Sequence, residues 1–174
     1  MSIIPEKMND SRVYVNDSPE YKGIADLQLP SLDAMTETIN AAGVLGEYES
    51  PNIGHMQSAK LTINWTSTID KKMTDFYKQE TIKVDCRLAD QRYDSNAAKH
   101  TFIANRVLVI GNVVKHDLGK AAKGSPYDGS SEIEVLYVKV ESDQETLLEY
   151  DRTNYIYKVD GKDVLADLRA ALGM

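Results

Sequence analysis

Ala59-Lys-Leu-Thr-Ile-Asn-Trp-Thr66 is the stretch of this sequence that indicates its fold class most clearly. Apolar and polar side chains alternate along it. Because successive side chains of a strand point to opposite faces of a sheet, the pattern predicts a strand with one buried and one solvated face. The alternation recurs in Thr81-Ile-Lys-Val-Asp-Cys-Arg-Leu88, whose expected core residues are Ile82, Val84, Cys86 and Leu88.

Turn-forming residues divide the rest of the chain into further β-like segments. Tight turns are expected at 142–145 and at Asp160-Gly161. Long loops are expected at about 41–56 and 116–130, where glycine, proline and polar residues gather. Strands are predicted at 12–16, 21–29, 36–39, 101–115, 132–141 and 146–159.

Two short helices complete the predicted elements. Ser67-Thr-Ile-Asp70 resembles a capping box that opens a short helix, and one face of this helix would carry Ile69, Met73, Phe76 and Tyr77. At the end of the chain, helical spacing predicts a helix over 163–172 with an apolar stripe of Val164, Leu165, Leu168 and Leu172. The expected fold is therefore mainly β, an antiparallel β-sandwich or partial barrel with one internal and one C-terminal helix.

Length and composition limit the function classes. The 174 residues are expected to form a single domain, 1–174. With 20 basic and 27 acidic residues the net charge is −7, which argues against a basic nucleic-acid-binding protein. Cys86 is the single cysteine, so an intramolecular disulfide and cysteine-rich zinc sites are excluded. We expect neither a secretory signal nor a membrane-inserted segment.

No catalytic, cofactor or metal site is expected. His55, His100 and His116 are far apart and lack metal-ligand spacing. Cys86 is expected to be a buried, unreactive thiol, and Trp65 a core residue. The carboxylate pairs Glu132/Glu134 and Glu149/Asp151 each lie on one face of a strand, as acid–base pairs could, but such pairs are common on solvated sheet faces.

Most of the net charge lies in one predicted hairpin. Residues 132–151 contain seven acids and one base, Lys139, and therefore carry −6. One interpretation is a solvated, self-repelling edge that prevents aggregation. The other is a surface that repels a polyanion or binds a basic partner.

The order of these features resembles the major tail tube proteins of contractile-tailed phages, the FII-type family, over nearly the whole chain. The similar segments are Leu27-Gln-Leu-Pro-Ser-Leu32, Ala41-Ala-Gly-Val-Leu-Gly46, Leu61-Thr-Ile-Asn-Trp65, Arg106-Val-Leu-Val-Ile-Gly-Asn-Val-Val-Lys-His-Asp-Leu-Gly-Lys120, Leu136-Tyr-Val-Lys-Val140 and Leu148–Leu165. The last of these, with its Tyr-Asp-Arg-Thr-Asn run and Lys-Val-Asp-Gly turn, is the most specific.

The resemblance implies a structural subunit rather than an enzyme. Its hexameric rings would stack into a hollow tube inside a contractile sheath, as the DNA conduit of a phage or the puncturing tube of a bacteriocin-like particle. Implied partners are further copies of the chain, the sheath, the tape measure and the baseplate tube initiator, with DNA as a transient cargo. The particle would assemble in the bacterial host cytoplasm, and the subunit would reside in the virion tail.

The residues suggest which surfaces would serve such an assembly. The two long loops are expected to order between subunits or rings, through Gly43, Gly46, Glu47, Tyr48, His55, Lys120, Lys123 and Tyr127. Polar strand faces such as Lys60/Thr62/Asn64 and Lys83/Asp85/Arg87 could line an aqueous bore. The charges expected to face either the lumen or the sheath are Lys60, Asp85, Arg87, Glu132, Glu134, Glu149 and Asp151.

An alternative is a β-sandwich module that binds carbohydrate or peptide. Such a module would need an exposed aromatic platform, to which Tyr150, Tyr155 and Tyr157 could contribute.

Overall fold

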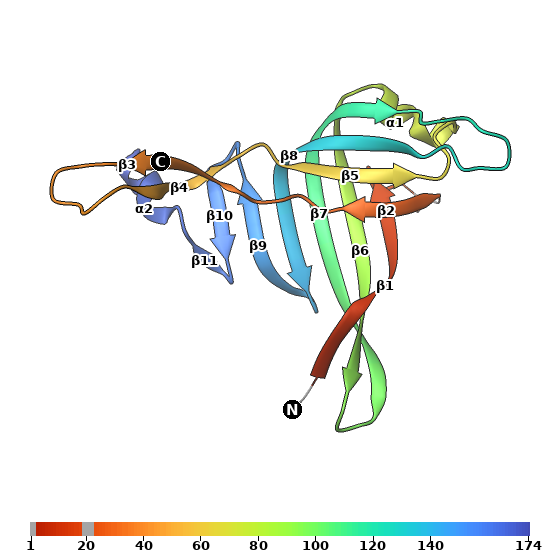
Figure 1. Cartoon of the computed structure of the whole chain (residues 1–174), viewed down its shortest axis with the longest axis horizontal. Helices are drawn as coiled ribbons and strands as arrows, with labels where there is room; N and C mark the ends of the chain where they lie inside the picture. Colours follow the sequence, from red (N-terminus) through yellow and green to blue (C-terminus); the bar gives the residue numbers. More distant parts are fainter. Residues whose placement is uncertain (1–2, 19–22) are drawn as a thin grey trace.

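The computed structural model describes residues 3–18 and 23–174 and is mainly β (Figure 1). One large antiparallel sheet has the strand order β1-β6-β7-β8-β9-β10-β11, and a separate hairpin joins β3 to β4. The strands are β1 (Ile3–Val15), β2 (Ile24–Gln28), β3 (Ala34–Ile39), β4 (Tyr48–Met56), β5 (Lys60–Trp65), β6 (Thr81–Asp94), β7 (Lys99–Asp117), β8 (Gly129–Ser142), β9 (Glu145–Asp151), β10 (Ile156–Val159) and β11 (Lys162–Asp163).

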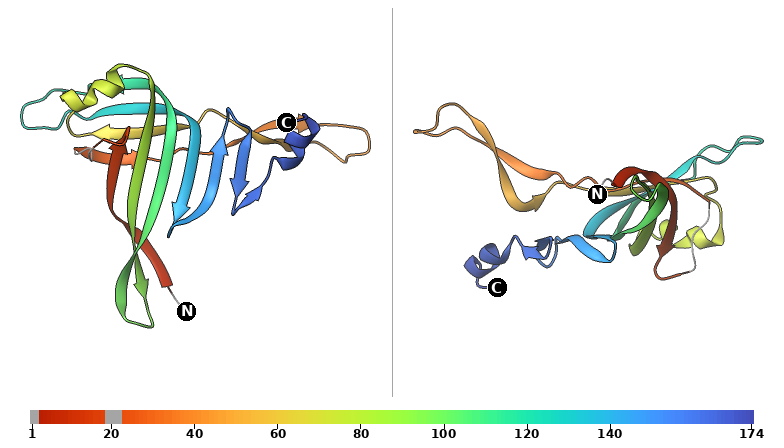
Figure 2. Two further views of the ribbon diagram at one scale, coloured as in Figure 1. Left: turned by 180° about the vertical axis from the view of Figure 1, so that it is seen from behind. Right: turned by 90° about the horizontal axis from the view of Figure 1, so that it is seen from below.

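The large sheet divides at β8. The first half of β8 pairs with β5, which in turn pairs with β2, whereas its second half pairs with β9. β7 runs along both halves on the other side. As a result the sheet curls, and β2 and β5 lie over β1, β6 and β7 (Figures 1 and 2). The predicted fold class, mainly β with antiparallel strands, is confirmed, and the sandwich-like body is formed by the curl of the large sheet.

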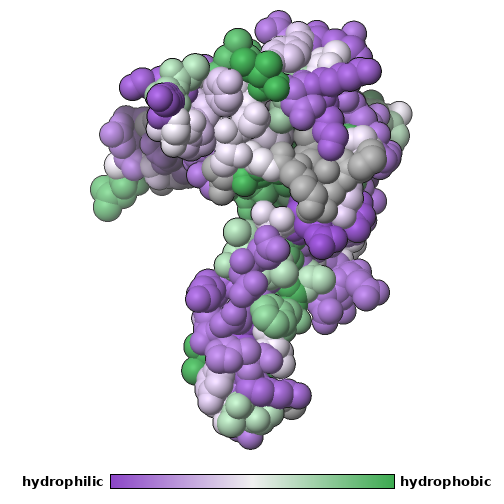
Figure 3. Space-filling model, turned by 90° about the vertical axis from the view of Figure 1, so that its right-hand side faces the viewer, coloured by the Kyte–Doolittle hydropathy of each residue, from purple (hydrophilic) through white to green (hydrophobic). Residues whose placement is uncertain are grey.

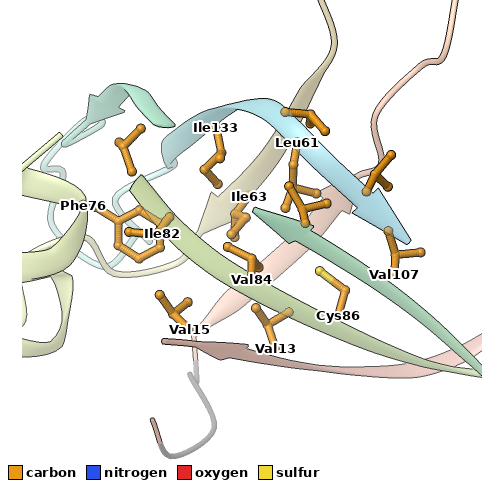
Figure 4. Packing of buried hydrophobic residues seen from close by; sticks show 14 of the residues in the cluster. Val13, Val15, Leu61, Ile63, Phe76, Ile82, Val84, Cys86, Val107 and Ile133 are labelled. Carbon is orange, nitrogen blue, oxygen red and sulfur yellow. The ribbon is translucent and has the colours of Figure 1, made fainter. Parts of the chain in front are cut away.

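The core fills this curl with side chains from alternate positions of the strands (Figure 4). Leu61 and Ile63 of β5 face Val84 and Cys86 of β6, and all four are fully buried. The alternation predicted for both strands is confirmed. Trp65 is buried too, donates its Nε1–H to Ser131 Oγ at 2.8 Å, and packs edge-on against Phe76 at 5.4 Å between ring centroids.

The internal helical segment covers one end of the core but begins later than predicted. The residue that caps it is Asp70, whose carboxylate accepts a hydrogen bond from the Lys72 backbone N–H, so the capping-box interpretation of 67–70 is wrong. A 3₁₀ turn, η1 (Lys71–Met73), leads into α1 (Thr74–Tyr77). Met73 and Phe76 are buried, whereas Ile69 and Tyr77 are exposed.

Three strand predictions need correction. The first strand begins nine residues earlier than predicted, at Ile3, because its exposed half pairs with the far end of β6. The predicted loop at 41–56 is mostly the strand β4, so that the loop covers only residues 40–47. The strand predicted at 146–159 is two strands, because Asp151 accepts hydrogen bonds from the backbone N–H groups of Thr153 and Asn154 and turns the chain.

Other predicted boundaries agree more closely. The second predicted strand appears as β2, although residues 21 and 22 of the predicted range lie outside the described residues. The turns at 142–145 and Asp160-Gly161 are present, with Asp143, Gln144 and Gly161 all at positive φ. The loop predicted at 116–130 is present over 118–128, between β7 and β8.

The C-terminal helix is α2 (Ala166–Ala171), shorter than predicted. Of its expected apolar stripe only Leu165 is buried, at 3% exposure, while Val164 and Leu172 are exposed. Leu165 packs against β4 at Gly54, where any Cβ would collide with its side chain. Leu165 therefore packs the C-terminal segment against the β3–β4 hairpin.

Replacing Leu165 by alanine should cost about 2–5 kcal/mol of unfolding free energy, because the surroundings of a truncated buried leucine relax only in part. Urea unfolding of the purified chain measures this cost. Leu172→Ala, at a position that is 56% exposed, is the matched control and should stay within about 0.5 kcal/mol. Equal losses for the two variants would contradict the assignment of Leu165.

Candidate assembly surfaces

The β3–β4 hairpin, here called the arm (residues 34–56), projects from the body past β10 and β11 (Figures 1 and 2). Its base is anchored: the Tyr150 hydroxyl donates to the Gly54 carbonyl at 3.2 Å, and an Arg152 N–H donates to the Gln57 carbonyl just beyond β4. Its tip is exposed and apolar, and Leu45 retains all of its accessible surface. Four of the predicted assembly residues, Gly43, Gly46, Glu47 and Tyr48, lie at this tip, and His55 lies near the base.

The loop 118–128 forms a second projection. The Lys120 N–H donates to the Tyr127 carbonyl at 2.5 Å, and the Tyr127 N–H donates to the Thr66 carbonyl at 3.1 Å, which fixes the base of the loop against β5. Gly119 has φ +76°, and a Cβ there would collide with the Tyr127 carbonyl. The exposed tip carries Lys123, and a surface tip on a fixed base is suited to contact with another molecule.

A third projection is the lower ribbon (residues 3–8 and 91–103), where the first half of β1 pairs with the far end of β6, and β6 pairs in turn with the start of β7. Figure 3 shows it as a narrow extension below the body, largely hydrophilic with apolar patches. Exposed apolar side chains of this ribbon include Ile3, Ile4, Met8 and Phe102, which are between 48% and 61% exposed. The sequence did not reveal this ribbon, because its polar residues show no regular alternation.

All seven charges predicted to face a lumen or sheath share one face of the large sheet, here called the polar face. The strand register shows this: Lys60 is opposite Glu134, Arg87 is opposite Arg106, and Lys139 is opposite Glu149. The opposite face of the same strands forms the core. The sequence therefore predicted correctly that these residues are polar positions of strands with a buried second face.

The acidic hairpin is largely neutralised on this face. Glu132 lies between Lys60 at 2.8 Å and Lys115 at 3.3 Å, and hydrogen bonds from these lysines lower the pKa of Glu132. Lys158 lies 3.8 Å from Glu149, and the Tyr137 hydroxyl donates to Glu149 at 3.0 Å. Because β8 pairs on both sides, the interpretation of residues 132–151 as a self-repelling edge is wrong.

Asp85 is the most buried acid of the polar face, at 6% exposure. Burial alone would raise its pKa, but hydrogen bonds and charge from Arg106 and Arg87 outweigh burial and lower the pKa. Arg106 holds both Asp85 oxygens, at 2.8 and 3.0 Å, and also Glu141 at 3.1 Å. The bidentate pair joins β6 to β7, and the bond to Glu141 extends the link to β8.

Stability should fall in acid. The folded-state pKa values of Asp85, Glu132 and Glu141 are all lowered, so their stabilising effect is present above the unfolded-state pKa values of about 4 and is lost as the pH falls through the lower folded-state values. We expect the unfolding free energy to change little between pH 7 and pH 5 and to drop below about pH 4. Urea titrations at several pH values measure it. In Asp85→Asn the unfolding free energy should fall less steeply in acid. An unchanged pH dependence of the unfolding free energy in that variant would contradict the role of the Asp85–Arg106 pair.

The edges of the sheet are incomplete. Within residues 3–18 and 23–174, β1 pairs only with β6, and β2 pairs only with β5. An edge strand with an open row of backbone groups is a template for pairing with another chain.

A family model described as phage tail tube protein FII matches residues 5–173. The chain belongs to this family. It is 24% identical over 172 residues to the major tail tube protein of Serratia phage KSP20, with 98% of each chain covered. It is also 25% identical over 177 residues to the tail tube protein of Escherichia phage P2, with 98% of this chain and 99% of the relative covered. The chain is thus a structural subunit of a phage tail tube and a component of the virion tail.

The three tyrosines expected to contribute to a binding module do not form an aromatic platform in this chain. Tyr150 is buried and packs edge-on against Tyr157 at 5.7 Å between centroids. Tyr155 is the one of the three that is exposed. The observation that suggested a carbohydrate-binding surface is therefore explained by packing under the arm.

The histidines of the chain lie on different parts of the fold. His55 is exposed on the arm, His100 lies 3.4 Å from Glu6 on the lower ribbon, and His116 Nδ1 lies 2.8 Å from Ser131 Oγ between Phe76 and Tyr77. In the described part of the chain, no group of three or more His, Cys, Asp or Glu residues could hold a metal ion.

Burial raises the pKa of the Cys86 thiol to about 12, which makes it a poor nucleophile at neutral pH. Among residues 3–18 and 23–174, no helix is long and apolar enough to cross a membrane.

Proposed function

We propose that this chain forms hexameric rings that stack into the inner tube of a contractile tail, a conduit for DNA or a puncturing device. The incomplete edges at β1 and β2 carry the proposal, since strands of neighbouring copies would complete them. The exposed arm and loop 118–128 supply further contacts within and between rings. The sheath, the tape measure and the baseplate tube initiator are the proposed partners, and assembly takes place in the host cytoplasm.

The polar face is proposed as the wall of the bore. DNA carries about one negative charge per 1.7 Å of its axis, so a conduit must avoid a strongly basic surface. Acids and bases on this face form ion pairs with one another. Their charges largely cancel, so the face has little net attraction for phosphate. The same pairing explains how an acidic hairpin can lie within a sheet without mutual repulsion.

We also propose that the chain has no enzymatic activity. Both carboxylate pairs that could have served as acid and base have other partners: Glu132 is held by two lysines and Glu134 accepts from Ser58 at 2.7 Å. In the second pair, Glu149 accepts from Tyr137 and Asp151 forms the turn to β10. These contacts give the four acids structural roles.

Native mass spectrometry of the purified chain, followed by negative-stain microscopy, tests the ring directly. The expected result is a six-copy species and tubes with a central hole. A chain that remains monomeric at high concentration, also in the presence of a tail initiator complex, would refute the proposal.

The placement of the bore has its own test. Glu132→Lys with Glu149→Lys should make the wall basic and slow DNA release from phage carrying the variant, because phosphates would bind the added lysines. Release is followed by dye fluorescence after triggered ejection. Normal release combined with loss of sheath binding would instead place the polar face on the outside of the tube.

A further inference from the structure

The open strand edges of this fold differ in how well they are protected against pairing with another chain. Proteins protect unused edges with proline, bulges and very short strands. β11 has only two residues, and β2 pairs regularly with β5 only over Asp26–Gln28, next to an irregularity. An edge without any of these devices is the better candidate for a contact between copies.

β1 is protected along its first half and open along its second. Pro5 is opposite Arg92, and a proline occupies such a position where its nitrogen points away from the partner strand, so the outer edge lacks a donor there. Two irregularities in the pairing with β6 follow before residue 11. Residues 11–15 then pair with β6 in regular register and contain no proline. The row that a neighbouring copy can complete is therefore residues 11–15.

Backbone groups of this row point outward. The Asn16 N–H donates to the Lys83 carbonyl at 2.8 Å. Because hydrogen-bonded and non-hydrogen-bonded pairs alternate along antiparallel strands, Val13 and Val15 direct their backbone groups away from β6. The Val15 carbonyl accepts from the Ser18 N–H at 3.0 Å. Val13 therefore presents both a donor and an acceptor to a strand from another chain.

The arm also has one protected and one open edge. It is a separate two-stranded sheet, and two strands alone are marginally stable in water. Pro51 of β4 is opposite Thr36 of β3, so its nitrogen faces outward and protects the β4 edge. β3 contains no proline, and by the same alternation Thr36 and Thr38 direct their backbone groups outward. The arm would thus be stabilised by a third strand, and β3 is the edge that can accept it.

A third open row is less suited to this contact. Residues 99–103 of β7 pair with β6 but lie before the first pair with β8. They continue a strand that is paired on both sides from Asn105 to Asn112 and so already belong to the large sheet. β3, by contrast, has β4 as its single partner among the described residues. Added hydrogen bonds therefore stabilise the arm more than they stabilise this row.

The open edges of β3 and β1 lie at opposite ends of the subunit. The arm is anchored at Tyr150 and Leu165 and projects beyond β10 and β11, whereas β1 forms the other margin of the large sheet (Figures 1 and 2). β3 and β1 of one chain are therefore too far apart to pair. Pairing of β3 with β3, or of β1 with β1, is isologous and closes a dimer. Pairing of β3 with β1 is heterologous, and its repetition closes a ring or extends a helix.

We infer that β3 of one copy adds to the outer edge of β1 in a second copy, with residues 36–39 alongside residues 11–15. Val13 exchanges backbone hydrogen bonds with Thr36 or Thr38, and the arm thereby joins the large sheet of its neighbour. The inference rests on the proposed self-assembly and names the segment that completes β1.

Proline substitutions at two matched sites of the arm test this pairing. Thr38 and Glu49 are opposite each other with outward backbone groups, so neither N–H holds the arm together, and thermal unfolding of the two variant subunits should be alike. Thr38→Pro removes an outward donor from β3 and should raise the critical concentration for assembly about 30-fold, measured by sedimentation of tubes. Glu49→Pro places the same ring on the protected edge of β4 and should assemble like the unmodified chain. Equal thresholds for the two variants would overturn the pairing.

Amide hydrogen exchange gives an independent measurement on the unmodified chain. The outward amides of Val13, Thr36 and Thr38 should exchange at least about 10-fold more slowly in tubes than in the free subunit, whereas the Glu49 amide should stay fast. Tubes in which residues 99–103 or β2 are protected in place of β3 would overturn the pairing of β3 with β1 alone. Failure of the unmodified chain to assemble would overturn the proposed function as well.

Discussion

Replacing Trp65 by alanine should destabilise the fold by about 3–5 kcal/mol, the range for large buried side chains cut back to a methyl group. The indole is 1% exposed and packs where β5, β8 and α1 meet. Its loss removes both the edge-on contact with Phe76 and the hydrogen bond to Ser131. Because small domains are stable by only about 5–15 kcal/mol, the variant should be largely unfolded at moderate urea concentrations.

Two further variants separate packing from hydrogen bonding. Trp65→Phe keeps most of the packing and loses the Nε1–H donor to Ser131, so its cost should be about 1–3 kcal/mol. Tyr48→Ala, on the exposed arm, should change stability by no more than about 0.5 kcal/mol. Urea unfolding followed by circular dichroism measures all three. If Trp65→Ala lost less than about 1 kcal/mol of unfolding free energy, Trp65 would not be a main source of the stability of the curled sheet.

Shortening the loop 118–128 should abolish tubes without unfolding the subunit. The hydrogen bond between Lys120 and Tyr127 closes the base of the loop, so residues 121–126 can be replaced by Asn-Gly, the preferred two-residue hairpin turn. Loop length has a small effect on folding free energy, and we expect a change of no more than about 1 kcal/mol. The exposed tip with Lys123 would be lost, and stacking of rings with it.

The experiment compares tube length by negative stain with subunit stability by thermal unfolding. Ser125→Ala, which keeps the loop at full length, is the control and should give normal tubes. Rings without tubes are the expected product of the shortened chain. Tubes of unchanged length would remove the loop from the stacking contact.

The sequence predicted the core better than the projections. Strict alternation in 59–66 and 82–88 has one cause, a sheet with a buried face, and the structure agrees at Leu61, Ile63, Val84 and Cys86. The arm gave no such pattern, because both of its faces are largely exposed and Pro51 and Gly54 interrupt it. Its anchor consists of contacts with Tyr150 and Leu165. These residues are far from the arm in the sequence, so the local pattern of the arm does not reveal the contacts.

Charge was harder to interpret than hydrophobicity. A count over residues 132–151 finds excess acid, yet Lys60 and Lys115 reach Glu132 from other strands and Arg106 reaches Glu141 from β7. Cross-strand register decides such pairs, and register is not visible in a single segment. The break in the strand at Asp151 did have a local signal, since Asp-x-Thr-Asn favours a side-chain-closed turn.

A cryo-electron microscopy reconstruction of the tube formed by the purified chain tests the central claim most directly. The account predicts six copies around a central hole, with backbone of a neighbouring copy in hydrogen-bonding register along the outer edge of β1 or β2. Rings in which the outer edges of β1 and β2 both face solvent, with subunits joined by side chains alone, would contradict it.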